Sequence, residues 1–244
     1  MSKQQKNNSD FIFTFKKLED QYKKALDLGY SFMTCYEYFK EKPNPSDLVV
    51  VNRVDVDLSI PKSLKLNEIF NKLGIKASFF IRLHAAEYNP MSFEAYRVIK
   101  EIDSNDHEIG YHSEIIDQAI IWNEDAKECL VRDLQFFKYY FGIDIKGVAS
   151  HGGITGLNNL DFWNEQNVSD FGFSYEAYSK DESFNLFDNS LYVSDSEWTQ
   201  WKSYKNGLLQ QGDTRTFGEH LDEKPNLIYL LIHPDTYYVN HIYE

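Results

Sequence analysis

The chain has very few cysteines and fewer basic than acidic residues. Its two cysteines, Cys35 and Cys129, lie far apart and form no CxxC motif. We therefore expect two reduced thiols rather than a disulfide or a zinc clasp. Lys and Arg number 25 against 38 Asp and Glu, which gives a net charge of −13. This excess argues against binding to nucleic acids or anionic membranes, because both are bound by clustered Lys and Arg.

The sequence also lacks long apolar runs, and none approaches the ~20 residues of a membrane span. Residues 1–8 are polar and do not resemble a secretory signal, so the chain as written is expected to be cytoplasmic. Residues 1–10 are predicted to be a flexible tail. A hydrophobic fraction of 42% is ample for a packed core. With no repeat and no long linker, residues 11–244 are predicted to form a single domain.

Apolar periodicity predicts alternating helices and strands in the first half of the chain. The predicted helices are 11–28, 64–73, 93–102 and 124–141, and the predicted strands are 48–57, 76–82, 107–112 and 145–149. The second half is less regular, with a short helix at 160–164 and strands at 171–178, 191–193 and 227–232. This alternation indicates an α/β fold in which helices connect parallel strands.

The predicted strand 48–57 ends in two carboxylates, Asp55 and Asp57. Its continuous apolar, β-branched character is typical of a strand buried on both faces. Residues two apart on a strand point to the same side, so the two carboxylates should lie together. Burying them is costly unless a cation or a proton shares them. The pair therefore indicates a metal site or an acid/base pair, and the alternative is that it caps the loop near Ser59.

Other predicted strands also end in polar groups suited to one site. These groups are His112 with Glu114, His151 before two glycines, and His233 after a six-residue apolar run. In α/β barrels the catalytic residues lie at the carboxyl ends of the strands. Imidazole and carboxylate groups are natural ligands of a zinc-like ion, and a remaining carboxylate and histidine would serve as general base and acid.

The order of these segments resembles the polysaccharide deacetylase superfamily of metal-dependent carbohydrate esterases. An acidic motif, Arg53–Asp57, precedes a helix that ends in Gly and a strand of the ATFF type within Leu73–Phe80. Asp106–His112 is similar to the GHEIGNH-like motif of the family, and Tyr229–His233 to its final strand ending in His. Ala149–Gly153 replaces the family's arginine- and proline-rich motif.

The resemblance implies a distorted (β/α) barrel and a divalent metal, most often zinc. It implies a hydrolase that removes an acetyl group from an N-acetylated saccharide. The pattern looks like a divergent branch, some of whose members are associated with bacterial surface-polysaccharide synthesis. Two other functions are compatible with the sequence: hydrolysis of a non-sugar amide on the same scaffold, and glycan binding by a homologue without metal.

Carried over by position, the resemblance makes Asp57, His112 and His151 the metal ligands, Asp55 the general base and His233 the general acid. Two departures qualify this assignment. The family's acidic pair is adjacent, whereas Val56 separates the two carboxylates here. The position of the family's second histidine ligand is Ile116. Either His151 or Glu114 replaces it, or the metal is weakly held or absent. We favour His151, because the glycines after it allow close approach.

Four residues are predicted to support the site or bind substrate: Arg53, Glu114, Asp195 and Trp198. Arg53 would keep Asp55 ionised or act as a structural partner. Asp195 would orient the histidine acid or sit in a turn. Trp198, with Trp201 and Tyr204, would stack on sugar or pack in the core. The other histidines are expected to be structural: His107 packs or bonds to the backbone, and His84, His220 and His241 lie on the surface or in loops.

Overall fold

Ten strands of the described chain form one sheet, with β2 in its interior. The structure is a computed structural model that describes residues 11–196 and 200–243. The strands are β1 (Ser31–Met33), β2 (Val49–Val56), β3 (Ser78–Arg82), β4 (Glu108–Ser113), β5 (Gly147–Ser150), β6 (Tyr175–Glu176), β7 (Leu191–Ser194), β8 (Lys202–Lys205), β9 (Leu208–Leu209) and β10 (Leu227–Ile232). Their order is β6-β5-β4-β3-β2-β10-β7-β8-β9, and β1 pairs with β2 outside this path.

All pairs from β6 to β7 are parallel, and only β7-β8 and β8-β9 among the described pairs are antiparallel. β10 runs along one edge of β2 from Val49 to Val54. On the other edge of β2, β1 pairs with Val49–Val51 and β3 pairs with Arg53–Val56. The predicted α/β class with a mostly parallel sheet, of the distorted barrel type, is confirmed.

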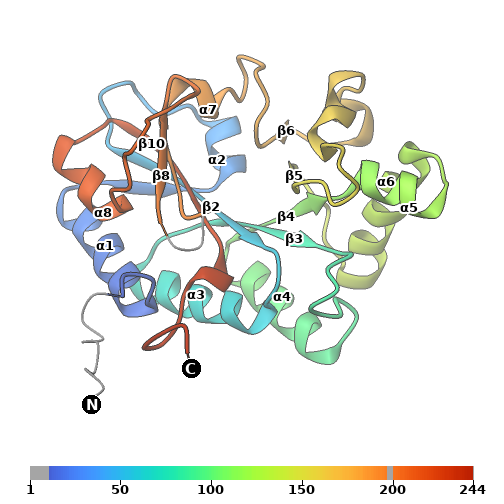
Figure 1. Cartoon of the computed structure of the whole chain (residues 1–244), viewed down its shortest axis with the longest axis horizontal. Helices are drawn as coiled ribbons and strands as arrows, with labels where there is room; N and C mark the ends of the chain where they lie inside the picture. The colour runs from blue at the N-terminus through green and yellow to red at the C-terminus, as the bar shows by residue number, and fades with distance from the viewer. Residues whose placement is uncertain (1–10, 197–199, 244) are drawn as a thin grey trace, which may run out of the picture.

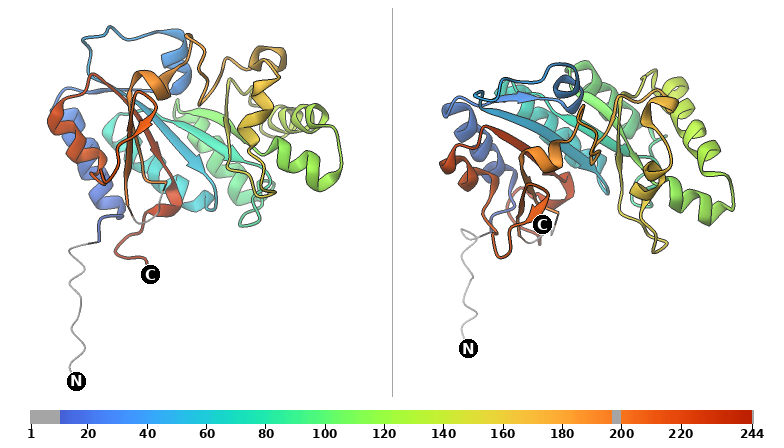
Figure 2. Two further views of the ribbon diagram at one scale, coloured as in Figure 1. Left: turned by 45° about the horizontal axis from the view of Figure 1, so that its top comes forward. Right: turned by 90° about the horizontal axis from the view of Figure 1, so that it is seen from above.

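Helices cover the outer face of the sheet, and Figure 1 shows α1, α3 and α4 side by side beneath it. The α-helices are α1 (Phe15–Asp27), α2 (Cys35–Lys40), α3 (Ile60–Leu73), α4 (Phe93–Ser104), α5 (Ile115–Trp122), α6 (Ala126–Phe136), α7 (Leu186–Asn189) and α8 (Phe217–His220). Short helical turns complete the connections: η2 (Phe137–Phe141), η3 (Asn159–Asn164), η4 (Val168–Phe171), η5 (Leu221–Glu223) and η6 (Pro234–Thr236). Figure 2 shows α5, α6 and the η3–η4 segment grouped at the end of the sheet formed by β5 and β6.

The ends of α3 show how local sequence sets the path of the chain into and out of the site. The Ser59 side chain accepts a hydrogen bond from the Lys62 amide, and proline occupies the first turn, where no amide donor is needed. Gly74 ends the helix with a φ of 67°, a left-handed conformation that glycine adopts without strain. The N-cap of α3 is thus Ser59, and neither Asp55 nor Asp57 caps this helix.

The predicted helix 124–141 is two elements, α6 and the π-helical turn η2, and α5 before it was not predicted. α5 has apolar residues on both its buried and its exposed side: Ile120, Ile121 and Trp122 are exposed, and Ile115 is buried. Without a polar face there is no helical period to detect. No helix in the described part of the chain has the length and apolar character needed to cross a membrane.

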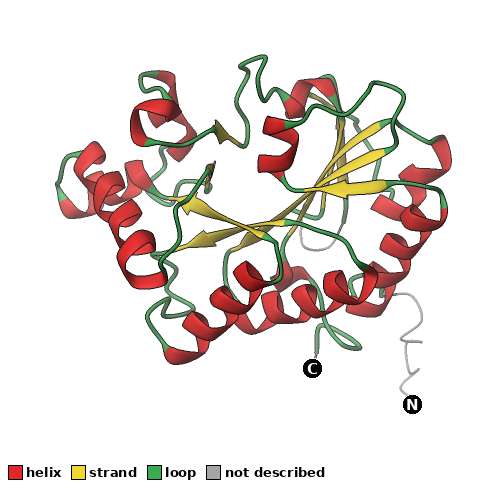
Figure 3. Ribbon diagram, turned by 180° about the vertical axis from the view of Figure 1, so that it is seen from behind, coloured by secondary structure: helices red, strands yellow, loops and turns green. Residues whose placement is uncertain are grey.

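β2 is buried along its whole length and alternates between two compartments. Val50, Val54 and Val56 pack in the large cluster beneath the outer helices. Val49 and Val51 belong to a second cluster on the opposite face, the concave side of the sheet. By the same alternation Arg53 and Asp55 project to that inner face, which Figure 3 shows flanked by the connecting segments. The sheet thus places charged groups at the carboxyl end of an otherwise apolar strand.

Candidate metal centre and active site

Three predicted ligands from three strands converge at the carboxyl edge of the sheet. Asp57 follows β2, His112 lies in β4, and His151 follows β5. One ligand atom from each lies within 4.8 Å of the other two. His112 is buried, and the other two are partly buried. These three residues could bind a metal ion.

The hydrogen bonding of His112 shows why a cation fits here. Its Nδ1 lies 2.8 Å from the carbonyl oxygen of Ala149, which can only accept, so Nδ1 carries a proton. In the neutral ring, Nε2 is then an unprotonated acceptor. It lies 3.1 Å from Asp57 Oδ1 and 3.4 Å from Asp55 Oδ2. Acceptors this close repel one another unless a proton or a metal ion lies between them.

The other two ligands each leave a buried acceptor unsatisfied. Asp57 Oδ1 is not aligned for a hydrogen bond with His112 despite their proximity, and among the described residues it has no other partner. His151 Nδ1 is likewise buried without a hydrogen bond, 3.7 Å from Glu114 Oε1. Buried polar atoms without partners are uncommon and costly. Two of them beside His112 Nε2 form a donor set suited to a zinc-like ion.

The pKa values of the three groups reflect this crowding. Burial raises the pKa of Asp57, but the nearby His112, His233 and His151 outweigh burial and hold it below its usual range. Burial lowers the pKa of His112, but the charges of Asp55 and Asp57 outweigh this and raise it. The pKa of His151 is lowered, first by burial and then by His112, so this imidazole is neutral and its lone pair is available.

Asp55 lies beside this cluster, held by Arg53. The guanidinium donates two hydrogen bonds to the carboxylate, Nε to Oδ1 at 2.8 Å and Nη2 to Oδ2 at 2.6 Å. Both side chains are buried, and the ring of Tyr178 lies 4.6 Å from the guanidinium carbon. Burial raises the pKa of Asp55, but the charge and hydrogen bonds of Arg53 outweigh burial, and the net effect is a lowered pKa. This carboxylate therefore remains ionised at neutral pH.

His233 approaches from the end of β10 and is held by Asp195, which follows β7. Asp195 Oδ1 lies 2.6 Å from His233 Nδ1, and its Oδ2 accepts from the His233 amide at 3.0 Å. The second ring nitrogen faces the cluster, with Nε2 3.9 Å from Asp57 Oδ2. Burial lowers the pKa of His233, but Asp195 outweighs it and raises that pKa to about 9. The imidazole is therefore protonated at neutral pH.

The remaining predicted site residues have different surroundings. Glu114 is not part of the three-residue group: its Oε1 forms a 2.8 Å ion pair with Arg82 Nη2, and its Oε2 is buried without a hydrogen bond among the described residues. Trp198 lies outside the described residues. Trp201 is buried and stacks on Phe13. Of the two interpretations of Trp201, packing in the core is therefore the one that the structure shows.

Two residues near the site were missed from the sequence. Arg82 is the last residue of β3 and pairs with His112 of β4. Its position at the end of a buried strand is the feature of the sequence that could have indicated it. Asp235 lies two residues after His233, and its Oδ2 accepts from the Leu58 amide at 3.0 Å. This bond joins the loop that carries Asp57 to the turn that follows His233. No short sequence motif indicates this hydrogen bond between Asp235 and Leu58.

No known family model matches the chain, and no curated protein matches it. Among solved structures, it is similar to a CE4 family pseudoenzyme from Bacillus anthracis, with 16% identity and a TM-score of 0.45 over 78% of this chain and 56% of that one. It is also similar to IcaB from Ammonifex degensii, with 16% identity and a TM-score of 0.43 over 61% of this chain and 71% of that one.

A third match is the Streptococcus pyogenes deacetylase PplD in complex with acetate, with 18% identity and a TM-score of 0.39 over 54% of this chain and 59% of that one. The chain is also similar to a mutant of the Bacillus pseudoenzyme, and it spans 58% of the length of that chain. The chain is thus similar in structure to CE4 polysaccharide deacetylases, the family that the motifs resemble, and the likeness concerns the fold.

Proposed function

We propose that the protein is a metal-dependent amide hydrolase that removes the acetyl group from an N-acetylated saccharide. The observation that carries the proposal is the convergence of three ligand atoms, two of them buried without a hydrogen bond to any described residue, with a separately held carboxylate and a separately held imidazolium. A binding protein has no evident need for an ionised base and a protonated acid on either side of a metal site.

Asp57, His112 and His151 would hold the ion, which supplies a polarised carbonyl and a water of lowered pKa when bound. The Ala149 carbonyl fixes the tautomer of His112, so that Nε2 faces the ion. Asp55 accepts the proton of the attacking water. Arg53 keeps Asp55 ionised and holds its carboxylate in one orientation.

His233 serves as the acid on the other side of the substrate. Its Nδ1 is fixed against Asp195, so the proton on Nε2 is the one that faces the site. That proton passes to the departing nitrogen as the carbon–nitrogen bond breaks. Base and acid thus come from different strands, β2 and β10, which are hydrogen-bonded neighbours in the sheet.

The third ligand is assigned to His151 rather than Glu114. Glu114 Oε1 is paired with Arg82, and Glu114 lies outside the three-residue group although its Oε2 is also buried without a hydrogen bond to any described residue. His151 has a ring nitrogen that is unpaired in the described part of the chain, and it belongs to the group in which one ligand atom from each residue lies within 4.8 Å of the others. The substitution of Ile116 for the family's histidine is thereby compensated from a neighbouring strand.

The proposal is tested by measuring acetate release from N-acetylated mono- and oligosaccharides and from simple acetamides. The protein is first loaded with zinc, and Asp55→Asn serves as a variant that keeps the ligands but loses the base. We expect release from the saccharides only, and a loss of about 10²–10⁴-fold in the variant. Release from simple acetamides alone would instead assign a non-sugar amide. Metal binding without any release would leave only glycan binding.

A further inference from the structure

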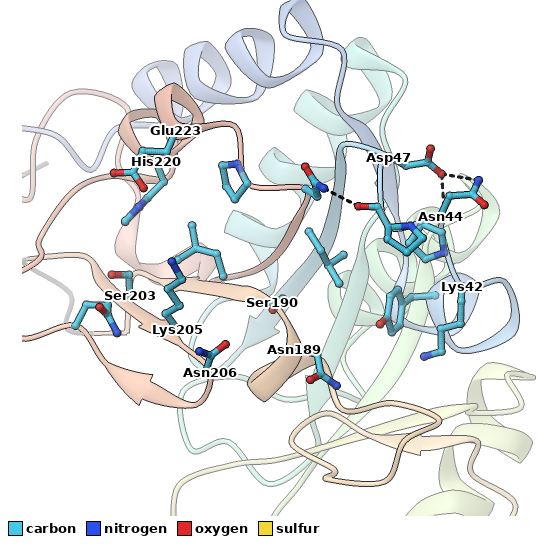
Figure 4. Close-up of a pocket in the computed structure, with 18 of the residues that line it drawn as sticks. Lys42, Asn44, Asp47, Asn189, Ser190, Ser203, Lys205, Asn206, His220 and Glu223 are labelled. Carbon is cyan, nitrogen blue, oxygen red and sulfur yellow. Dashed lines mark hydrogen bonds between the residues drawn. The ribbon is translucent and has the colours of Figure 1, made fainter.

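A cavity lies at the amino edge of the sheet, away from the candidate metal ligands. Its volume is about 660 Å³, within the usual range of small-molecule sites. The loop before β2, the starts of β7 and β10, the end of β8 and α8 line it. Figure 4 shows His220, Glu223 and Lys205 on the wall opposite Lys42, Asn44 and Asp47. Six residues of β10, about 20 Å of strand, separate this edge from His233.

The acidic groups in the cavity wall are already paired. Asp213 accepts from Arg215 at 2.9 Å (Nε to Oδ1) and 2.8 Å (Nη2 to Oδ2). The same guanidinium contacts Glu223 at 2.5 Å. On the opposite wall Asp47 accepts from the amide and side chain of Asn44. Each of these carboxylates therefore already has a hydrogen-bond donor in the wall, although Arg215 is shared by two of them and Asn44 is uncharged.

The clearest unsatisfied group is His220, which was predicted to be a surface or loop histidine and is in fact 1% exposed. Neither ring nitrogen has a hydrogen-bond partner among the described residues, and Nε2 lies 3.8 Å from Asp213 Oδ2. Burial lowers the pKa of His220, so the ring is neutral and offers one donor and one acceptor. A buried ring with both nitrogens unpaired is costly, and a ligand hydroxyl can satisfy it.

Other unpaired groups around the cavity are also mostly neutral. The exposed side chains of Asn189 and Asn206 line its rim, and no described residue donates a hydrogen bond to them or accepts one from them. The Tyr38 hydroxyl is equally without a partner in the described ranges 11–196 and 200–243. Carboxamides and hydroxyls donate and accept at once, as sugar hydroxyls do. Lys205 adds one further donor on this wall.

We propose that this cavity is a second binding site whose ligand is a saccharide unit, recognised through its hydroxyls by His220, Asn189, Asn206 and Tyr38. A multiply charged anion would face the Asp213 and Glu223 carboxylates, and a cation would face Lys205 and Arg215. A neutral, hydroxyl-rich molecule meets neither repulsion. The site goes beyond the proposed hydrolase and requires neither metal nor catalysis.

The test is a titration of the full chain with N-acetylglucosamine, followed by calorimetry or NMR. His220→Phe replaces the imidazole with an aromatic ring that lacks both nitrogens, and Asn189→Trp blocks the cavity from an exposed position on its rim. His151→Ala serves as the matched control at the other edge. We expect binding to weaken about tenfold or more in both cavity variants, as expected for the loss of one or two hydrogen bonds, and to persist in His151→Ala.

Circular dichroism and metal content establish that the cavity variants fold, and Asn189→Trp keeps the test valid if His220→Phe does not. Binding that disappears in His151→Ala and survives in both cavity variants would overturn the proposal, since the sugar would then bind only at the metal site. Binding of inorganic phosphate that competes at the cavity, without binding of N-acetylglucosamine, would overturn the saccharide assignment. Absence of any sugar binding to the wild type would overturn it as well.

Discussion

The two edges of the same sheet differ in what they leave unsatisfied. At the carboxyl edge Asp57 and His151 each have a buried atom without a hydrogen bond in the described part of the chain, and both belong with His112 to one cluster of possible ligands. At the amino edge Asp213 is paired with Arg215, and the neutral imidazole of His220 has no hydrogen-bond partner among the described residues. The first edge is suited to a cation and to proton transfer, and the second to a neutral polar ligand.

The difference follows from how each edge is built. Asp55, Asp57 and His112 stand on or directly after strands whose register the apolar sheet fixes. The amino edge is assembled from the loop before β2, from α8 and from the starts of β7 and β10. The proposed catalytic groups thus stand where the strands end, and the proposed saccharide site where they begin.

Removal of the acid should produce the largest effect on activity. His233→Asn takes away the proton donor while leaving the three ligands in place. We expect kcat to fall about 10²–10⁴-fold with unchanged metal content. Asn189→Trp at the amino edge should leave kcat on a small acetylated sugar nearly unchanged. Equal losses in the two variants would remove the distinction between the edges.

Breaking the Arg53–Asp55 pair should produce the largest effect on stability. Arg53→Met leaves a buried carboxylate without its partner and should cost about 3–5 kcal/mol in the free energy of unfolding. The double variant Arg53→Met/Asp55→Leu removes both charges and should recover most of that loss, although it should be inactive. Urea unfolding measures both. A loss below about 1 kcal/mol in Arg53→Met would mean that water reaches this pair.

Asp235 allows a smaller test of the loop contact beneath the site. Burial raises the pKa of Asp235 to about 6, so the folded state holds this proton more tightly than the unfolded chain does. The stability that this proton provides is present at low pH and is lost as the pH rises from about 4 to about 6.

Asp235→Asn keeps an oxygen acceptor for the Leu58 amide and removes the titration. Relative to the variant, the wild type should lose about 1–3 kcal/mol between pH 4 and pH 7, measured by urea unfolding of metal-free protein. Parallel pH dependence in the two proteins would refute the assignment. Asp235→Ala, which leaves the amide unpaired, should be the less stable variant at both pH values.

The smallest expected effect is a shift in the pH profile of activity. Asp195 raises the pKa of His233 to about 9, and a bound cation at the neighbouring site would lower it. Activity should therefore fall on the alkaline side, at or below about pH 9. Asp195→Asn should move this limb down towards the ordinary histidine pKa near ~6.5. A limb that stays in place would show that another group donates the proton.

The sequence allowed the carboxyl edge to be predicted in detail. Asp57, His112, His151 and His233 each follow or end an apolar run, and parallel strands bring such positions to one edge. The partnership of Asp195 with His233 was foreseen as one of two interpretations, and the structure shows the hydrogen bond. The Arg53–Asp55 pair was foreseen because residues two apart on a strand are neighbours.

Other features could not be read from the sequence, because they depend on contacts between distant segments. The burial of His220 depends on α8 packing against the loop at Asp213, and nothing near residue 220 indicates it. The ion pair that occupies Glu114 depends on Arg82, one strand away. The antiparallel strands β8 and β9 are short and partly exposed, so they carry little apolar periodicity.

The central claim is tested most directly by elemental analysis of metal in the purified, zinc-reconstituted protein and in three variants. The account predicts about one zinc per chain in the wild type and in Glu114→Gln, and loss of zinc from Asp57→Ala and His151→Ala. Metal retained by His151→Ala and lost by Glu114→Gln would contradict the ligand assignment. A wild type that holds no metal after reconstitution would contradict the hydrolase itself.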